Sequence, residues 1–192
     1  MSDTINYYNE NAADFISRTV DADMEEMRER FLKYLEKDAF ILDAGCGSGR
    51  DTKAFLEKSY SVKAIDGSEE ICARASAFTG ISVKCCRFEE LDEIEAYDGI
   101  WACASLLHVD KKNLPEVLGR MYNALKPGGV IYASLKYGPG ERISDGKYYH
   151  DVTPKSLEEY FQDAGFIKEE VFITGDVREN IGDRWVNIIA RK

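Results

Sequence analysis

The stretch Ile41-Leu-Asp-Ala-Gly-Cys-Gly-Ser-Gly-Arg50 decides the fold of this chain. It begins in a short apolar run, residues 40–42, and turns on glycines at every second position, Gly45, Gly47 and Gly49. Glycine permits positive φ and lets a ligand lie directly on the backbone. A buried strand that ends in such a turn and leads into a helix is typical of the nucleotide site of a parallel α/β sheet. A turn that binds no ligand is the alternative interpretation of the glycine spacing alone.

A carboxylate follows the next apolar run at the distance that a nucleotide site needs. Asp66 ends the run 61–66, roughly 20 residues beyond the turn, where an acidic side chain can bind ribose hydroxyls. A turn residue or a helix cap is the alternative role for Asp66. A dinucleotide fingerprint also needs a third glycine, and Arg50 occupies its position. The spacing therefore argues against a nicotinamide-dependent oxidoreductase.

The remaining sequence alternates between strand and helix patterns. Strands are expected at residues 40–42, 61–66, 81–85, 99–103, 130–135, 166–174 and 185–190, and helices at 21–37, 52–56, 69–78, 112–125 and 154–164. Alternation of this kind predicts a parallel sheet covered on both faces. The last two strands have no helix between them, so they should pair as an antiparallel hairpin. The sequence thus predicts one α/β domain, residues 1–192, with six parallel strands and one reversed strand.

Charge and cysteine usage limit the classes of partner. The formal net charge is −10, which repels a phosphate backbone, so no nucleic-acid partner is expected. The five cysteines are odd in number and include the vicinal pair Cys85-Cys86, which argues against a disulfide framework, and no metal site is expected. No apolar stretch reaches the ~18 residues of a membrane span, and the N-terminus lacks a signal-peptide pattern. We therefore expect a cytoplasmic protein without a membrane partner.

Five motifs in order resemble those of class I S-adenosylmethionine-dependent methyltransferases. They are residues 41–50, 64–69, 88–91, 97–109 and 125–132. The most similar subgroup is the small stand-alone bacterial type that includes tellurite-resistance methyltransferases. The resemblance implies a Rossmann-like, seven-stranded, mostly parallel sheet and S-adenosyl-L-methionine as the cofactor. It also implies transfer of a methyl group to a small acceptor by in-line displacement. A cofactor-binding module without catalysis is the second interpretation.

The resemblance also implies a set of cofactor-binding residues. In the core these are Asp43, Gly45, Gly47, Ser48, Asp66, Gly67, Ser68, Arg87, Phe88, Glu89, Ala102 and Ser105. The glycines would lie against the methionine portion, Asp66 would bind the ribose, and Arg87 and Phe88 would flank the adenine. Phe88 stands where many relatives have a small polar or acidic residue, with Glu89 as the substitute. Residues 1–37 resemble a helical lid, from which Tyr8 and Arg18 would reach the cofactor.

The chemistry demands little of the protein beyond alignment. Methyl transfer from a sulfonium needs nucleophile, methyl carbon and sulfur in line, without a covalent intermediate. A general base is needed only for acceptors that carry a proton. His108, after the fourth strand, is the candidate base, and capping of the following helix is its alternative role.

Two basic and aromatic segments are expected to form the rim of the cleft around the acceptor. They are the loops 136–153 and 175–184, which follow the fifth and sixth strands of the core, residues 38–192. The substrate-rim residues predicted there are Lys136, Arg142, Tyr148, Arg178 and Trp185. With Lys147 and Arg184 they predict a local positive potential and a small-molecule acceptor that is anionic or aromatic. Ion pairs with acidic residues of the same loops would cancel that potential. The acceptor atom and the oligomeric state are not predicted.

Overall fold

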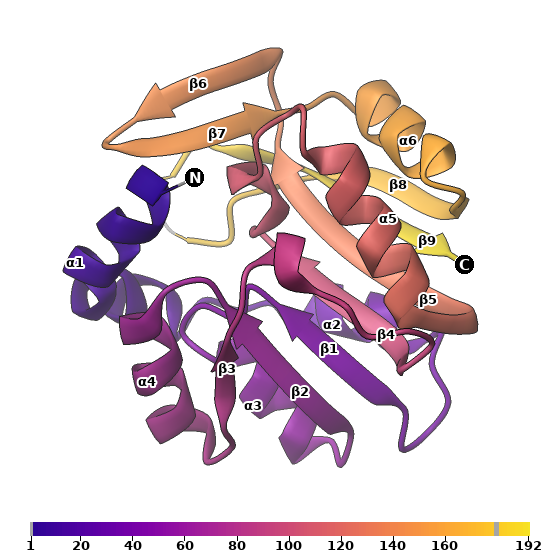
Figure 1. Ribbon diagram of the computed structural model, residues 1–192, viewed down its shortest axis with the longest axis horizontal. Coiled ribbons are helices and arrows are strands. Elements are labelled where there is room, and N and C mark those ends of the chain that lie inside the picture. Colours follow the sequence, from indigo (N-terminus) through magenta and orange to yellow (C-terminus); the bar gives the residue numbers. More distant parts are fainter. Residues whose placement is uncertain (1, 179–180) are drawn as a thin grey trace.

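A seven-stranded sheet forms the centre of the molecule in the computed structural model, which describes residues 2–178 and 181–192 (Figure 1). The strands are β1 (Phe40–Ala44), β2 (Ser61–Asp66), β3 (Val83–Cys85), β4 (Tyr97–Cys103), β5 (Leu125–Lys136), β8 (Ile167–Gly175) and β9 (Arg184–Arg191). Their order in the sheet is β3-β2-β1-β4-β5-β9-β8. Only β9 runs against its neighbours, because it pairs antiparallel with both β5 and β8. The predicted six parallel strands and one reversed strand are confirmed.

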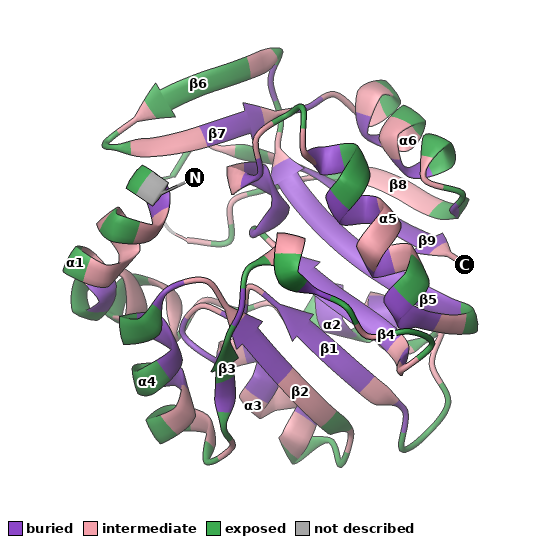
Figure 2. Ribbon diagram, in the orientation of Figure 1, coloured by how far each residue is buried: buried purple, intermediate pink, exposed green. Residues whose placement is uncertain are grey.

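Helices cover both faces of this sheet. The helices α2 (Glu25–Leu32), α3 (Arg50–Glu57) and α4 (Glu69–Thr79) lie on one face, and α5 (Leu114–Ala124) and α6 (Pro154–Asp163) lie on the other. Alternate side chains of β1 point to opposite faces: Ile41 packs with Phe31 and Phe55, whereas Leu42 packs with residues of α5 and α6. The central strands are accordingly buried along most of their length (Figure 2).

The order of the strands fixes where a ligand can bind. From β1 the chain winds outward to β2 and β3 and then crosses back to β4 on the other side of β1. Such a reversal opens a crevice at the carboxyl ends of the two central strands, here β1 and β4. The glycine turn that follows β1 lies at this crevice.

The N-terminal region differs from the expected lid of residues 1–37. The first helix, α1 (Ser2–Thr19), is kinked at Asn11 and lies beside α4. The second, α2, ends at Leu32 instead of residue 37, and its Met27 and Phe31 are buried in the core under the sheet. Within residues 1–37 only α1 is left for the predicted lid role, because the apolar stripe of α2 is used for core packing. Among the described residues, no helix has the length and apolar character to cross a membrane.

The rim segments also differ from plain loops. Residues 136–153 contain a two-stranded hairpin, β6 (Gly140–Ser144) and β7 (Lys147–Asp151). Its turn, Asp145-Gly146, has positive φ at both residues, the geometry that favours a tight hairpin. In the second segment, 175–184, residues 179–180 lie outside the described part of the chain.

Candidate functional site

The glycine turn after β1 exposes backbone instead of side chains. Gly45 and Gly47 have φ values of +80° and +53°, and the N–H groups of Gly45 and Cys46 both donate to the Ile65 carbonyl of β2. A Cβ on Gly45 would lie 2.4 Å from the Cβ of Ser105, closer than side-chain atoms approach. Only glycine therefore allows the turn to sit against the segment after β4.

A buried carboxyl group supports the turn from beneath. Asp43 accepts a 2.5 Å hydrogen bond from the Thr52 hydroxyl of α3. Burial, together with the negative charge of Asp51, raises the pKa of Asp43 to about 7. Ser48 is buried in the turn as well. Neither Asp43 nor Ser48 lines the cavity described next, so both position the turn from behind.

A cavity of about 700 Å³, open mouth included, lies in front of the turn. Its walls come from the turn, the end of β2, the segment before the short helix η1 (Phe88–Glu90), the short helix η2 (Leu106–His108) and α1. One carboxylate, that of Asp66, lies on this wall, and Ile71, Cys86 and Phe88 make the neighbouring wall apolar. A mostly apolar wall with one carboxylate is typical of a site that binds a small molecule.

Backbone N–H groups hold the Asp66 carboxylate in place. Its Oδ2 accepts from Gly47 N at 3.1 Å and its Oδ1 from Ser68 N at 3.0 Å. Burial raises the pKa of Asp66, and these N–H groups oppose that shift because they stabilise the charged form. Each oxygen uses one lone pair in this way, so further acceptor capacity remains on the cavity wall.

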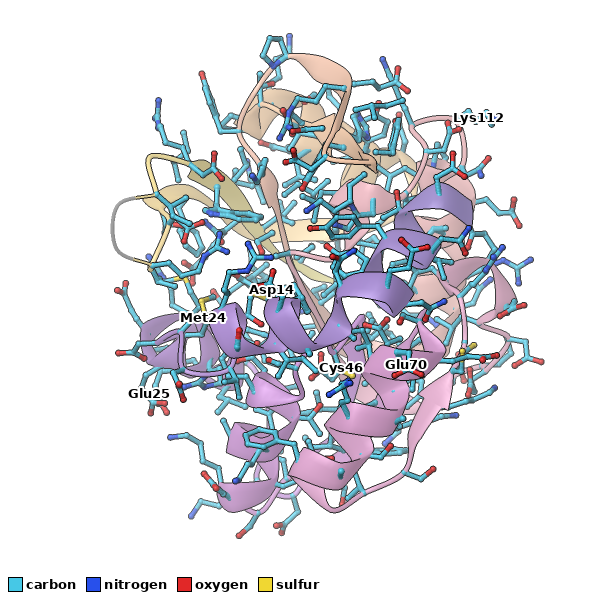
Figure 3. The ribbon with its side chains drawn as sticks, turned by 90° about the vertical axis from the view of Figure 1, so that its left-hand side faces the viewer. Asp14, Met24, Glu25, Cys46, Glu70 and Lys112 are labelled. Atoms are coloured by element: carbon cyan, nitrogen blue, oxygen red, sulfur yellow. The ribbon has the colours of Figure 1, made fainter. Side chains whose placement is uncertain are left out.

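Helix α1 closes the cavity through three polar contacts. Thr4 Oγ1 accepts from Tyr148 N at 3.0 Å, the Tyr8 hydroxyl contacts His108 Nε2 at 2.8 Å, and Asn9 Oδ1 accepts from Ser68 Oγ at 2.6 Å. Figure 3 looks at the molecule from the α1 side, with Asp14 of this helix and Cys46 of the turn marked. These contacts join α1 to β7, to η2 and to the residue that caps α4.

His108 joins α1 to the hairpin β6–β7. Its Nδ1 lies 2.7 Å from the Tyr148 carbonyl, which only accepts, so Nδ1 carries the hydrogen and Nε2 accepts from the Tyr8 hydroxyl. Burial lowers the pKa of His108 to about 4, and the positive charges of Lys147, Lys136 and Arg142 act in the same direction. The imidazole is therefore neutral at pH 7, with both nitrogens engaged.

Comparisons with known proteins identify the chemistry of this site. The family described as a methyltransferase domain matches residues 41–129. An uncharacterized methyltransferase of Staphylococcus carnosus is 24% identical over 154 residues, 75% of this chain and 74% of that protein. The malonyl-[acyl-carrier protein] O-methyltransferase of Pectobacterium atrosepticum is 30% identical over 122 residues, 60% of this chain and 46% of that protein.

A solved structure matches along the whole chain. It is the 1,6-didemethyltoxoflavin-N1-methyltransferase of Burkholderia thailandensis, crystallised with its substrate and S-adenosylhomocysteine. The TM-score is 0.83 at 26% identity, over 100% of this chain and 88% of that one. The chain is a class I S-adenosylmethionine-dependent methyltransferase. The finer resemblance of this methyltransferase to tellurite-resistance enzymes stays a prediction, as does its cytoplasmic location.

The cavity fits the cofactor of this methyltransferase. The chemistry of its wall, one carboxylate beside an apolar slot and an exposed backbone turn, matches a ribose, a flat base and an amino-acid tail. Glu89 adds a buried Oε2 without a hydrogen-bond partner among the described residues, although Glu89 itself does not line the cavity. A buried acceptor without a partner is costly unless a ligand supplies the donor.

The sequence-predicted cofactor residues fall into two groups. Those that line the cavity are Tyr8, Gly45, Gly47, Asp66, Gly67, Ser68, Arg87, Phe88 and Ser105. Those that do not are Arg18, Asp43, Ser48, Glu89 and Ala102. Ala102 is fully buried within β4, and Arg18 pairs with Asp14 at 2.7 Å on the exposed side of α1. The structure thus places Arg18 in an ion pair on its own helix.

Ion pairs offset the positive potential predicted at the rim, which is the alternative that the sequence left open. Arg142 pairs with Asp151 at 2.6 Å and Arg178 with Asp176 at 2.7 Å, so neither guanidinium is available to an anion. Lys136 pairs with Asp183 at 2.6 Å. Acidic residues within and beside the same segments supply all three partners. We call these three, Lys136, Arg142 and Arg178, the paired rim cations.

The aromatic rim residues are also placed differently from the expectation. The Tyr148 hydroxyl donates to Glu141 and accepts from Lys111 N, which fixes the ring outside the cavity. Its neighbour Tyr149 is buried, with its ring 5.0 Å from that of His108. The indole N–H of Trp185 donates to Asp176, the partner of Arg178.

Several cavity residues were not predicted from the sequence. They are Thr4, Ile5, Phe15, Ile71, Cys86, Ala104 and Val109. For α1 the signal existed, because Ile5, Tyr8, Ala12 and Phe15 recur at helical spacing and so share one face. No local pattern distinguishes Ile71 or Val109 from core residues.

Proposed function

We propose that this methyltransferase methylates a small, planar aromatic acceptor. Support comes from the η2 end of the cavity, where the rings of Tyr8 and His108 lie 5.5 Å apart and Tyr149 stands behind His108. Aromatic walls favour flat ligands, because ring stacking adds to the burial of apolar area. The relative from Burkholderia thailandensis, which spans the whole chain, acts on a heterocycle.

In this proposal the carboxylate end of the cavity holds the cofactor. Asp66 accepts the ribose hydroxyls on its remaining lone pairs, and Ile71, Cys86 and Phe88 enclose the adenine. The backbone at Gly45 and Gly47 faces the methionine portion. The acceptor then binds toward η2, beside Ser105 and His108.

The residues of the chain align the partners and exclude water. When bound, S-adenosylmethionine supplies an electrophilic methyl group, whose bond to sulfur breaks with its electrons left on sulfur. Closure of α1 over the cavity keeps water from the reacting atoms. A base whose conjugate acid has a pKa of about 4 removes protons poorly at neutral pH. We therefore give His108 a positioning role: it fixes the Tyr8 ring of α1. The methylated product keeps the proton of the acceptor until it leaves the cavity and releases the proton to solvent.

Release of S-adenosylhomocysteine tests the proposal. Purified protein with S-adenosylmethionine is given planar N-heterocycles, 1,6-didemethyltoxoflavin among them, and non-aromatic amines and alcohols of similar size. We expect product release with members of the planar set only. Turnover of the non-aromatic set alone would contradict the proposed acceptor class and leave the methyltransferase assignment intact.

A further inference from the structure

Lys147 differs from the paired rim cations. No carboxylate of residues 2–178 and 181–192 lies within ion-pair distance of its Nζ, whereas each paired rim cation has an acidic partner. The Nζ lies 4.1 Å from the ring centroid of Tyr7 and 5.9 Å from that of Tyr149. The side chain is partly buried, and the described part of the chain leaves this charge between two rings without a counter-ion.

Both rings connect Lys147 to the acceptor end of the cavity. Tyr7 packs edge-on against Tyr8 with centroids 5.6 Å apart, and Tyr149 lies 5.0 Å from His108. Tyr8 and His108 line the cavity. The uncompensated charge therefore lies one ring behind the cavity wall, at the junction of α1 and β7.

Three cationic side chains lie around His108 at this end of the cavity. Lys147, Lys136 and Arg142 all act on the imidazole, and the last two lie 5.2 Å and 4.2 Å from the Tyr149 centroid. Their own acidic partners offset part of the charge of Lys136 and Arg142. Lys147 has no such partner among residues 2–178 and 181–192. In a chain of net charge −10, a positive site beside a ligand cavity favours an anion.

We propose that the charge of Lys147, acting from behind the wall formed by Tyr8 and His108, favours an aromatic acceptor that carries an anionic substituent such as a carboxylate. The inference rests on the proposed function, because it assigns the charge of the acceptor that the η2 end receives. A cation bound to the nucleophilic atom itself would withdraw electron density and slow its attack on the methyl carbon. The group that Lys147 recognises is therefore a substituent, and the nucleophilic atom points away from Lys147 toward the cofactor.

Two probes of nearly equal shape isolate the charge. The protein is saturated with S-adenosylhomocysteine and titrated with benzoate or benzamide, and the dissociation constants are measured by calorimetry or NMR. We expect benzoate to bind about five- to tenfold more tightly than benzamide, with the preference reduced by added salt. Lys147→Gln should bring the ratio close to one. Arg184→Gln is the matched control, because Arg184 lies over the exposed ring of Tyr137, 4.6 Å from its centroid, and has no ion pair among the described residues.

The outcomes separate this inference from the proposed function. A benzoate preference that disappears in Lys147→Gln and persists in Arg184→Gln supports it. Equal affinity for both probes, no binding of either, or a preference that survives Lys147→Gln overturns it. The affinity for S-adenosylhomocysteine should be unchanged in Lys147→Gln, which confirms a folded cofactor site. Methylation of uncharged planar acceptors alone would overturn the inference and leave the proposed acceptor class standing.

Discussion

The Asp66 carboxylate is fixed by two backbone N–H groups, so its loss should act on the cofactor more than on the fold. Asp66→Ala removes the hydrogen bonds to the ribose hydroxyls, each worth about 1.5–3 kcal/mol when the acceptor is charged. We expect the affinity for S-adenosylmethionine to fall by roughly one to two orders of magnitude in calorimetry.

Asp92→Ala is the control for Asp66→Ala, because it removes an equal charge from an exposed position outside the cavity. It should leave the affinity unchanged. An Asp66→Ala protein that folds normally and binds the cofactor as tightly as wild type would contradict the role assigned to Asp66.

Single residues were predictable where their role depends on the backbone. Gly45, Gly47 and Asp66 were predicted because the turn and the strand end occur at fixed spacing, and all three line the cavity. The prediction names Tyr148 and not Tyr149 at the rim, because a loop gives no rule for which side chain faces the cavity. In a strand, neighbouring side chains point to opposite faces, and that places Tyr149 beside His108. The partners of the rim cations depend on three-dimensional proximity, which counting charges does not reveal.

At the scale of an element, the turn after β1 is the part least tolerant of change. Gly45→Ala places a Cβ 2.4 Å from that of Ser105 at a φ of +80°. The left-handed backbone costs about 1–2 kcal/mol and the overpacking about 1–3 kcal/mol. The free energy of unfolding should therefore fall by roughly 2–5 kcal/mol. Urea denaturation measures this loss, and cofactor binding should weaken in parallel.

Gly119→Ala provides the matched control for Gly45→Ala. Gly119 lies within α5, and a Cβ there would meet nothing within 4 Å. Alanine has the higher helix propensity, so this variant should gain about 0.5–1 kcal/mol. If both variants lost stability equally, the contact with Ser105 would not be the cause.

Most elements of the sheet were predictable, because buried strands are short apolar runs that end at glycine or acidic residues. The end of α2 and the hairpin β6–β7 were not. The stripe of Met27 and Phe31 suggested a helix as far as residue 37, but α2 ends at Leu32 and Asp38 adopts positive φ before β1. The hairpin β6–β7 was missed although Asp145-Gly146 is a recognised hairpin signal, since its flanking residues lack apolar alternation.

At the scale of the whole molecule, two buried groups give the stability of the fold opposite dependences on pH. The folded pKa of Asp43 is raised from 3.8 to about 7, so its contribution is complete below 3.8 and is lost as the pH rises through 7. The folded pKa of His108 is lowered from 6.5 to about 4, so its contribution is complete above 6.5 and is lost as the pH falls through 4. Between pH 4 and 6.5 the stabilising contribution of Asp43 therefore falls as the pH rises, whereas that of His108 increases.

Removal of either group should change how the free energy of unfolding depends on pH. With Asp43→Asn, the free energy of unfolding should rise with pH more steeply than in wild type, by up to about 1.4 kcal/mol per pH unit. With His108→Gln it should fall with pH instead. Urea denaturation at several values between pH 4 and 6.5 measures both slopes. If the free energy of unfolding changed with pH in the same direction in both variants, Asp43 and His108 would not have opposite effects.

The place of β9 in the sheet has a consequence for synthesis on the ribosome. β8 precedes β9 in the chain, but it lies at the edge of the sheet and pairs only with β9. Because a nascent chain leaves the exit tunnel N-terminus first, β8 emerges before β9 and waits without the strand that joins it to β5. During that interval Val171 and Phe172 are uncovered beside unpaired backbone, which makes 167–175 the segment where we expect a chaperone to bind.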